Sequence, residues 1–327
     1  MTEKTARQIE GLKAQTFGVE IEGNNITREK AARVAAEHFG TGRYENTAYR
    51  DSYMTWTAYD QQGREWKFQR DSSIYGPDSE KCELVTPVLT FADLEDFLRL
   101  LRKLRHAGMK SCPSRGCGVH IHVGTKGLDG RDHDARSLRN LVNIMAAHEE
   151  QIGRAIRIDA GRTGHYCQVV NKNFLQKVNS QKPKTMRALA NCWYEGNGAD
   201  HNATSHYNHS RYHMLNLHPC LSLALGSTDH AKPTVEFRLF QFREKSKDSL
   251  GGIDCREMKA YIHLCLAMSE LAKEVVYASP KPQQTENEAY AFRCWMLRLG
   301  FIGDEFAQTR EVLMANLEGN CAWRSAC

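Results

Sequence analysis

Apolar and polar residues alternate in several short segments of the chain. In the segment 16–22, TFGVEIE, every second residue is apolar, so a strand places Glu20 and Glu22 on the same face. Aromatic and β-branched residues at 53–59, a turn at 61–63 and a returning segment at 65–70 predict a hairpin. The same reasoning predicts further strands at 81–87, 118–124, 212–217 and 234–240.

Helical spacing of apolar residues separates these strands. Thr27 is a predicted N-cap of a helix that stops at Gly40, and Thr90 with Asp93 forms a capping-box pattern ahead of a leucine-rich stripe that ends at Gly108. Further helices are predicted near 136–158, 254–273 and 287–299. The segment 161–213 has weak periodicity, which predicts loops and short helices.

This order of strands and helices predicts an α+β fold with an antiparallel sheet and helices packed on one face. At 41% hydrophobic and 25% charged residues, the chain of 327 residues is typical of a globular protein. No linker-like composition divides it, so we expect one domain over 1–327, with a core at about 16–245 and a helical part at about 250–327.

Charge and cysteine content restrict the cellular setting. The net charge of +5 is a small difference between 44 basic and 39 acidic residues, which favours a mixed surface over a nucleic-acid partner. Eleven dispersed cysteines, a charged N-terminus without an apolar leader, and no long apolar run predict a cytoplasmic protein with reduced thiols and no membrane partner.

Acidic and imidazole side chains recur on the predicted strands. A single glutamate between apolar residues usually marks the solvent face of a strand, but four strands repeat the pattern in one chain. Such oxygen-rich sets suit Mg²⁺ or Mn²⁺, and Mn²⁺ accepts a histidine more readily. Carboxylates gathered in a dry site need cations or protons to offset their charge. The residues are Glu20, Glu22, Glu83, His120, His122 and Glu236, with Arg238 beside the last.

Two alternatives accompany this interpretation. Cys112 and Cys117 with His120 and His122 would make a zinc-stabilised binding module, although their spacing matches no standard finger. A metal-dependent hydrolase is the second, because similar ligands activate water without a nucleotide. The chain has neither a P-loop motif nor a strand-linked G-x-G-x-x-G motif.

Six short motifs follow one another along the chain: FGVEIE (17–22), RDSSI (70–74), ELVTP (83–87), CGVHIHVG (117–124), RYHMLNL (211–217) and VEFRLF (235–240). In this order they resemble the amidoligases of the carboxylate-amine ligase group, whose fold looks like the catalytic core of glutamine synthetase and glutamate-cysteine ligase. The resemblance covers about residues 16–245 and implies ATP-dependent amide formation through an acyl phosphate.

The resemblance also implies two metal sites for Mg²⁺ or Mn²⁺. Glu22 and Glu83 would serve the site near the substrate carboxylate. Glu20, Glu236 and one histidine, His122 in preference to His120, would serve the site that bridges the ATP phosphates. Arg238 would neutralise the transferred phosphoryl group, and the remaining candidates for catalytic or cofactor contacts are Asn216, Arg162 and Asp71.

The sequence identifies neither the substrates nor the oligomeric state. The family implies a carboxylate and an amine, such as an amino acid, a peptide or a protein tail, and a homo-oligomer is neither indicated nor excluded. The chain departs from the family pattern after VEFRLF, where QFREKSKDSLGGID follows. The segment 200–213, with His201, His206, His209 and His213, is either a lid or accessory metal patch or, as we favour, a solvated loop.

Overall fold

The computed structural model describes residues 2–198, 205, 207–227, 231–244 and 252–322. They form two compact units, each built from several segments of the chain. The helical unit comprises Met1–Thr16, His122–Leu239 and Ala260–Cys327, and the strand-rich unit comprises Phe17–Ile121 and Phe240–Lys259. The expectation of a single catalytic domain stays a prediction.

Most strands of the strand-rich unit pair in the order β2-β3-β4-β5-β1, followed by the start of β7. The pairs β2–β3, β3–β4, β4–β5 and β5–β1 are antiparallel, and β6 pairs with β1. The elements of this unit are β1 Gln15–Ile21, α2 Arg28–His38, β2 Tyr44–Asn46, η1 Ala48–Arg50, β3 Trp56–Tyr59, β4 Glu65–Gln69, β5 Glu83–Val85, β6 Leu89–Thr90, η2 Phe91–Asp93, α3 Leu94–His106, η3 Pro113–Arg115 and the first part of β7 Val119–Gly127.

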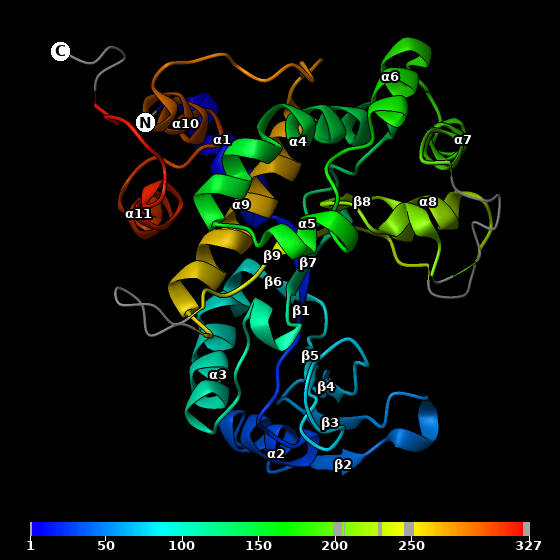
Figure 1. The fold of residues 1–327 in the computed structure, drawn as a ribbon, viewed down its shortest axis with the longest axis vertical. Coiled ribbons are helices and arrows are strands. Elements are labelled where there is room, and N and C mark those ends of the chain that lie inside the picture. The colour runs from blue at the N-terminus through cyan, green and yellow to red at the C-terminus, as the bar shows by residue number, and fades with distance from the viewer. Residues whose placement is uncertain (1, 199–204, 206, 228–230, 245–251, 323–327) are drawn as a thin grey trace. The chain divides into compact units, whose positions relative to one another are not determined.

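Local sequence signals account for the helices of the strand-rich unit. The Thr27 side chain accepts the backbone N–H of Lys30 at 3.2 Å and caps α2. Small alanines on the buried face of α2 let it pack closely on β3 and β4, and α3 lies beside α2 (Figure 1). Thr90 and Asp93 form the predicted capping box before α3. These helix starts are confirmed.

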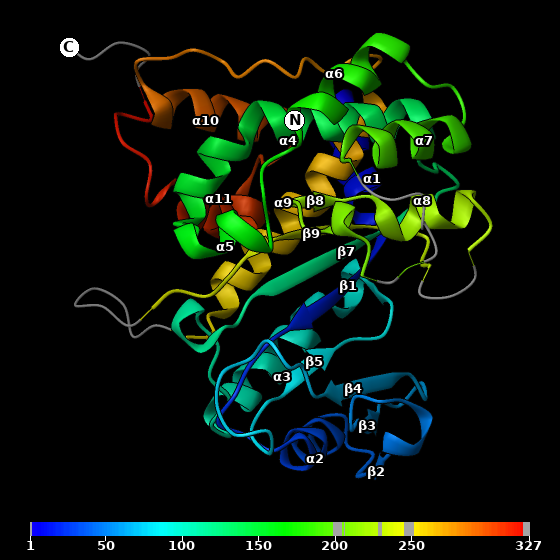
Figure 2. The same cartoon turned by 45° about the vertical axis from the view of Figure 1, so that its right-hand side comes forward.

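The helical unit combines the remainder of β7 with β9 and β8, and β8 pairs with β9 in antiparallel register. Figure 2 shows α6 and α7 on one side of α4, with α10 and α11 on the other. Its elements are α1 Glu3–Lys13, the rest of β7, α4 Ala135–Ile156, α5 Ala160–His165, α6 Lys172–Gln181, α7 Met186–Gly196, η4 His209–Arg211, β8 Leu215–Asn216, α8 His218–Ala224, β9 Thr234–Phe240, α9 Cys255–Glu274 (from Ala260 onward), α10 Glu288–Arg298, η5 Asp304–Phe306 and α11 Ala307–Met314.

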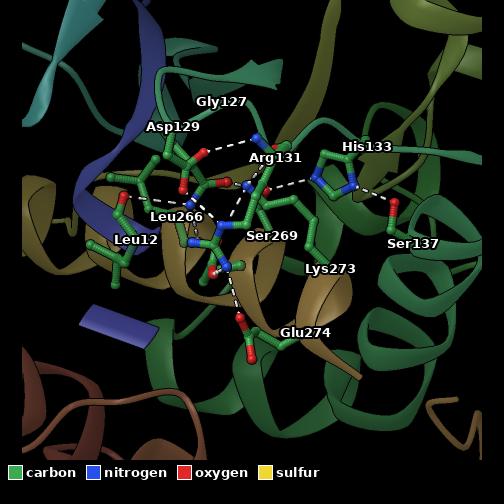
Figure 3. A network of polar contacts seen from close by, with 12 residues as sticks. Leu12, Gly127, Asp129, Arg131, His133, Ser137, Leu266, Ser269, Lys273 and Glu274 are labelled. Carbon is green, nitrogen blue, oxygen red and sulfur yellow. Dashed lines mark hydrogen bonds and ion pairs between the residues drawn. The ribbon is translucent and has the colours of Figure 1, made fainter. Parts of the chain in front are cut away.

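A buried polar network joins the segment after β7 to α9 in the helical unit (Figure 3). Arg131 pairs with Asp129, Glu270 and Glu274, each at 2.7 Å. His133 bridges the hydroxyl groups of two serines, one from α4 and one from α9. The network therefore fixes the chain between β7 and α4.

The α+β class with an antiparallel sheet and helices is confirmed. The strand predicted at 212–217 is wrong in extent, since β8 holds only Leu215–Asn216. It ends because the Asn216 Oδ1 atom accepts the N–H of His218 at 2.8 Å and Pro219 opens α8. None of the helices among the described residues has the length and apolar character needed to span a bilayer.

Candidate active site

Glu22 and Glu83 lie opposite each other across β1 and β5 in the strand-rich unit. The antiparallel register pairs Ile21 with Leu84, so the next pair along the ladder is Glu22 with Glu83. The Cys82 N–H donates to the Gly23 carbonyl oxygen at 2.9 Å, which continues the pairing one step further. Side chains directly opposite in such a pair point to the same face and come close together.

Asp71 joins these two glutamates. The register of β4 and β5 pairs Gln69 with Glu83, and Asp71 follows two residues after Gln69, where β4 has ended. One carboxylate oxygen from each of Glu22, Asp71 and Glu83 lies within 4.8 Å of the other two. We refer to these three residues as the carboxylate triplet.

The loop that carries Asp71 is held from two distant parts of the sequence. Asn24 donates from Nδ2 to the Tyr75 carbonyl oxygen at 2.9 Å and accepts from Arg115 Nη1 at 2.9 Å. Gly116 has φ of 68°, and a Cβ atom there would lie 2.7 Å from the Ser73 carbonyl oxygen. The close approach of residues 115–116 therefore sets the position of the Asp71 loop.

Charge repulsion within the carboxylate triplet is unfavourable, because Glu22 is buried. Glu22 is only 7% exposed, and its Oε2 atom accepts the N–H of Gly118 at 2.5 Å. Within the part of the chain that the structure describes, no lysine, arginine or histidine forms an ion pair with Glu22 or Asp71. Three carboxylates this close, one of them buried, repel one another unless a cation offsets their charge. The all-oxygen donor set fits Mg²⁺ or Mn²⁺.

Glu20 and His120 form a second acidic and imidazole contact in the strand-rich unit. The His120 Nδ1 atom lies 3.3 Å from Glu20 Oε2, and the side chains are 8% and 19% exposed. The alternation of β7 places His120 and His122 on one face, while the apolar face of Val119, Ile121 and Val123 is fully buried, as predicted.

Glu236, Arg238 and Asn216 form a buried polar set in the helical unit. Asn216 and Glu236 are direct partners in the register of β8 and β9, and Asn216 Nδ2 donates to Glu236 Oε2 at 2.6 Å. Arg238 Nη1 donates to Glu236 Oε1 at 2.5 Å. All three residues are at most 5% exposed. Each Glu236 oxygen thus has a donor, and a carboxylate retains further lone pairs for a cation.

Arg162 reaches this set from α5. Its Nη2 atom donates to the Arg238 backbone oxygen at 3.0 Å, so it contacts the backbone of β9. Arg238 Nε lies 3.5 Å from the Tyr166 carbonyl oxygen, and His122 Nδ1 lies 3.3 Å from Thr234 Oγ1 at the start of β9. Tyr166 and Thr234 were not predicted, and no spacing in the sequence marks them.

Burial disfavours the thiolate form of both cysteines of the zinc alternative. Burial raises the pKa of the Cys117 thiol to about 12 and also raises the pKa of Cys112. A raised pKa disfavours the thiolate that zinc requires. Neither cysteine belongs to a group of metal-ligating side chains within the described residues.

The histidine-containing segment 200–213 is described in part. His201 and His206 lie outside the described residues. His209 is exposed, whereas His213 is buried and its Nδ1 atom bonds to the Ser210 carbonyl oxygen at 3.0 Å.

A family model described as "Putative amidoligase enzyme" matches residues 13–269. Among solved structures, the chain is similar to a bifunctional glutathione synthetase from Pasteurella multocida, with 15% identity and a TM-score of 0.45. The match covers 96% of this chain and 48% of that chain, so this chain spans about half its length. No curated protein matches the chain.

Proposed function

The chain belongs to the "Putative amidoligase enzyme" family, and from this premise we propose that it is an ATP-dependent carboxylate-amine ligase. The observation that carries the proposal is the carboxylate triplet, in which Glu22 is buried among acidic neighbours without a basic partner in the described residues. A divalent cation is the simplest means of offsetting this charge, and phosphoryl transfer from ATP depends on such cations.

Glu22, Asp71 and Glu83 would hold one Mg²⁺ or Mn²⁺ ion. That cation would reduce the repulsion between the anionic carboxylate substrate and the anionic phosphates. The assignment of Glu20, Glu236 and His122 to a second metal site stays a prediction from the family resemblance. Asp71, first expected to contact the cofactor, is now proposed as a metal ligand.

Arg238 is proposed to stabilise the charge on the phosphoryl group that is transferred. Glu236 and the Tyr166 carbonyl oxygen orient its planar guanidinium, which matches the geometry of phosphate oxygens. Asn216 orients Glu236, and Arg162 holds the β9 backbone at Arg238. These two are therefore proposed as positioning residues.

The proposed reaction has two steps. A carboxylate oxygen of the substrate bonds to the γ-phosphorus of ATP while the bond from that phosphorus to ADP breaks, which gives an acyl phosphate. The amine nitrogen then bonds to the acyl carbon, phosphate leaves, and the amine loses a proton. The proposed substrates are an amino acid, a peptide or a protein tail. We also propose that the core is glutamine synthetase-like and that the protein is cytoplasmic.

The test is ADP release by the purified protein with ATP and Mg²⁺ or Mn²⁺, across pools of amino acids, peptides and polyamines. Glu22→Gln and Glu236→Gln should abolish substrate-stimulated ADP release, because each removes the charge of a proposed ligand and keeps the side-chain volume. Circular dichroism checks that Glu236→Gln stays folded, since it leaves Arg238 without its carboxylate partner. Glu37→Gln is the matched control, since that carboxylate is 67% exposed on α2. Cleavage of a pooled compound without nucleotide would instead support the hydrolase alternative.

A further inference from the structure

A cavity of about 280 Å³ lies in the helical unit between α4 and α10. Figure 2 shows α10 beside α4, and α10 follows the residues 13–269 that the family model matches. Most of the cavity wall is therefore built outside that region, and none of the candidate active-site residues lines it. The lining residues are His148, Gln283, Tyr290, Cys294, Trp295 and Arg298.

The wall contains a rigid aromatic pair. The rings of His148 and Trp295 stack with centroids 4.0 Å apart and planes inclined by 13°. The His148 Nδ1 atom bonds to the Ile144 carbonyl oxygen at 2.8 Å, so Nδ1 carries the proton and Nε2 is an acceptor in the neutral ring. Burial lowers the pKa of His148, and the charge of Arg298 lowers it further.

The charge of the lining is positive. Arg298 is its one charged residue, and no carboxylate among the described residues pairs with the guanidinium. The nearby Glu288 is instead bound to Arg154. The Tyr290 hydroxyl group also has no protein partner in the described parts of the chain. Both groups are donors and line the same cavity, so each can contact an anion there.

Trp295 is only 6% exposed, so its ring is a fixed part of the cavity wall. The cavity volume is close to the lower limit of about 300 Å³ for ligand pockets, so it suits a small molecule.

We propose that this cavity binds a small aromatic carboxylate, separately from the ligase site. The carboxylate pairs with Arg298 and Tyr290, the flat ring lies along the aromatic wall, and a hydroxyl group on the ring donates to His148. A cationic group on the ligand is disfavoured because no lining residue is acidic.

The experiment is calorimetric titration of the full chain with 4-hydroxybenzoate, its methyl ester and cyclohexanecarboxylate. The wild-type protein should bind 4-hydroxybenzoate, and the other two compounds should bind at least about tenfold more weakly, because each lacks the charge or the flat ring. Arg298→Gln should weaken binding by about tenfold or more. Arg293→Gln, an exposed arginine of the same helix that is not part of the lining, should leave binding unchanged.

Alkylation provides a second readout that does not depend on activity. Cys294 lines the cavity, whereas Cys321 is exposed and is not part of the lining. Bound 4-hydroxybenzoate should slow iodoacetamide labelling of Cys294 and leave labelling of Cys321 unchanged, as read by peptide mass mapping. Absence of binding to the wild-type protein, or equal binding to wild type and Arg298→Gln, would overturn the proposal.

Discussion

The side-chain amide of Asn216 donates to the Oε2 atom of Glu236 at 2.6 Å, and the two residues are direct partners across β8 and β9. The amide orients a carboxylate that Arg238 holds on its other oxygen. Removal of such an orienting partner from a metal-ligating group reduces metal affinity or activity by about 10- to 100-fold.

Asn216→Ala should therefore lower ADP release by about 10- to 100-fold and raise the Mn²⁺ concentration needed for half-maximal activity. Steady-state kinetics at varied Mn²⁺ measures both effects. Asn173→Ala, an exposed asparagine on α6, is the control. Unchanged Mn²⁺ dependence in Asn216→Ala would show that Asn216 does not act through a metal ligand.

Gly116→Ala should weaken Mn²⁺ binding to the carboxylate triplet, because a Cβ atom would push against the Ser73 carbonyl oxygen and shift the Asp71 loop. Gly130→Ala is a matched control, since Gly130 has a similar φ of 78° with no atom within 4 Å of its Cβ position. Both variants should lose about 1–2 kcal/mol from the left-handed backbone conformation. Calorimetric Mn²⁺ titration separates them, and equal affinity in both would contradict the positioning role of Gly116.

Glu270→Gln should lower the free energy of unfolding by about 3–5 kcal/mol, because it removes the carboxylate that offsets the charge of the buried Lys273 side chain. The Glu270 side chain is fully buried and pairs with Arg131 at 2.7 Å and Lys273 at 3.2 Å. Glu274→Gln removes a more exposed partner of Arg131 and should cost less than about 1 kcal/mol. Urea unfolding compares the two, and similar losses would argue against a special role for the buried pair.

Acid should destabilise the helical unit through His133. Burial lowers the pKa of His133 to about 3, and the charge of Lys273 adds to the effect. The Ser269 hydroxyl group donates to Gln15 Oε1 at 2.5 Å, so its oxygen accepts from His133 Nε2. The lowered pKa keeps the His133 ring neutral in the folded protein. The unfolded state takes up a proton near pH 6.5 and the folded state does not, so stability falls as the pH drops from about 6.5 toward 3.

Up to about 1.4 kcal/mol per pH unit should be lost in this window through His133. Unfolding in urea at a series of pH values should show a shallower decline for His133→Gln than for the wild-type protein, since glutamine does not titrate. Other buried histidines contribute equally to both proteins, so the difference isolates His133. Parallel profiles would show that His133 is not the titrating group.

Local signals were sufficient for much of the fold. Alternation predicted β9 at Thr234–Phe240, and the caps at Thr27 and Thr90 marked the starts of their helices. Helix α1 was not predicted, because few apolar residues mark it and tertiary contacts such as the Gln8 Nε2 bond to the Arg298 carbonyl oxygen hold it. Such contacts between residues far apart in sequence leave no periodic trace.

The candidate site was likewise predicted only in part from local sequence signals. Strand alternation predicted that Glu22 and Glu83 each lie on the acidic face of their own segment. The register between these segments brings the two side chains together. The placement of Asp71 beside them depends on Asn24 and Arg115, whose contacts with its loop no motif spacing reveals. The role of Arg162 as a backbone partner of Arg238 likewise required three-dimensional contacts.

The most direct test of the central claim is the stoichiometry of ADP and amide product for a substrate pair drawn from the active pool. Mass spectrometry of the product with parallel measurement of ADP should give one amide, formed with loss of water from the two substrates, for each ADP, only when Mg²⁺ or Mn²⁺ is present. Glu22→Gln should yield neither product. Products that have gained water without ATP consumption, or tightly retained zinc with no nucleotide turnover, would contradict the ligase assignment.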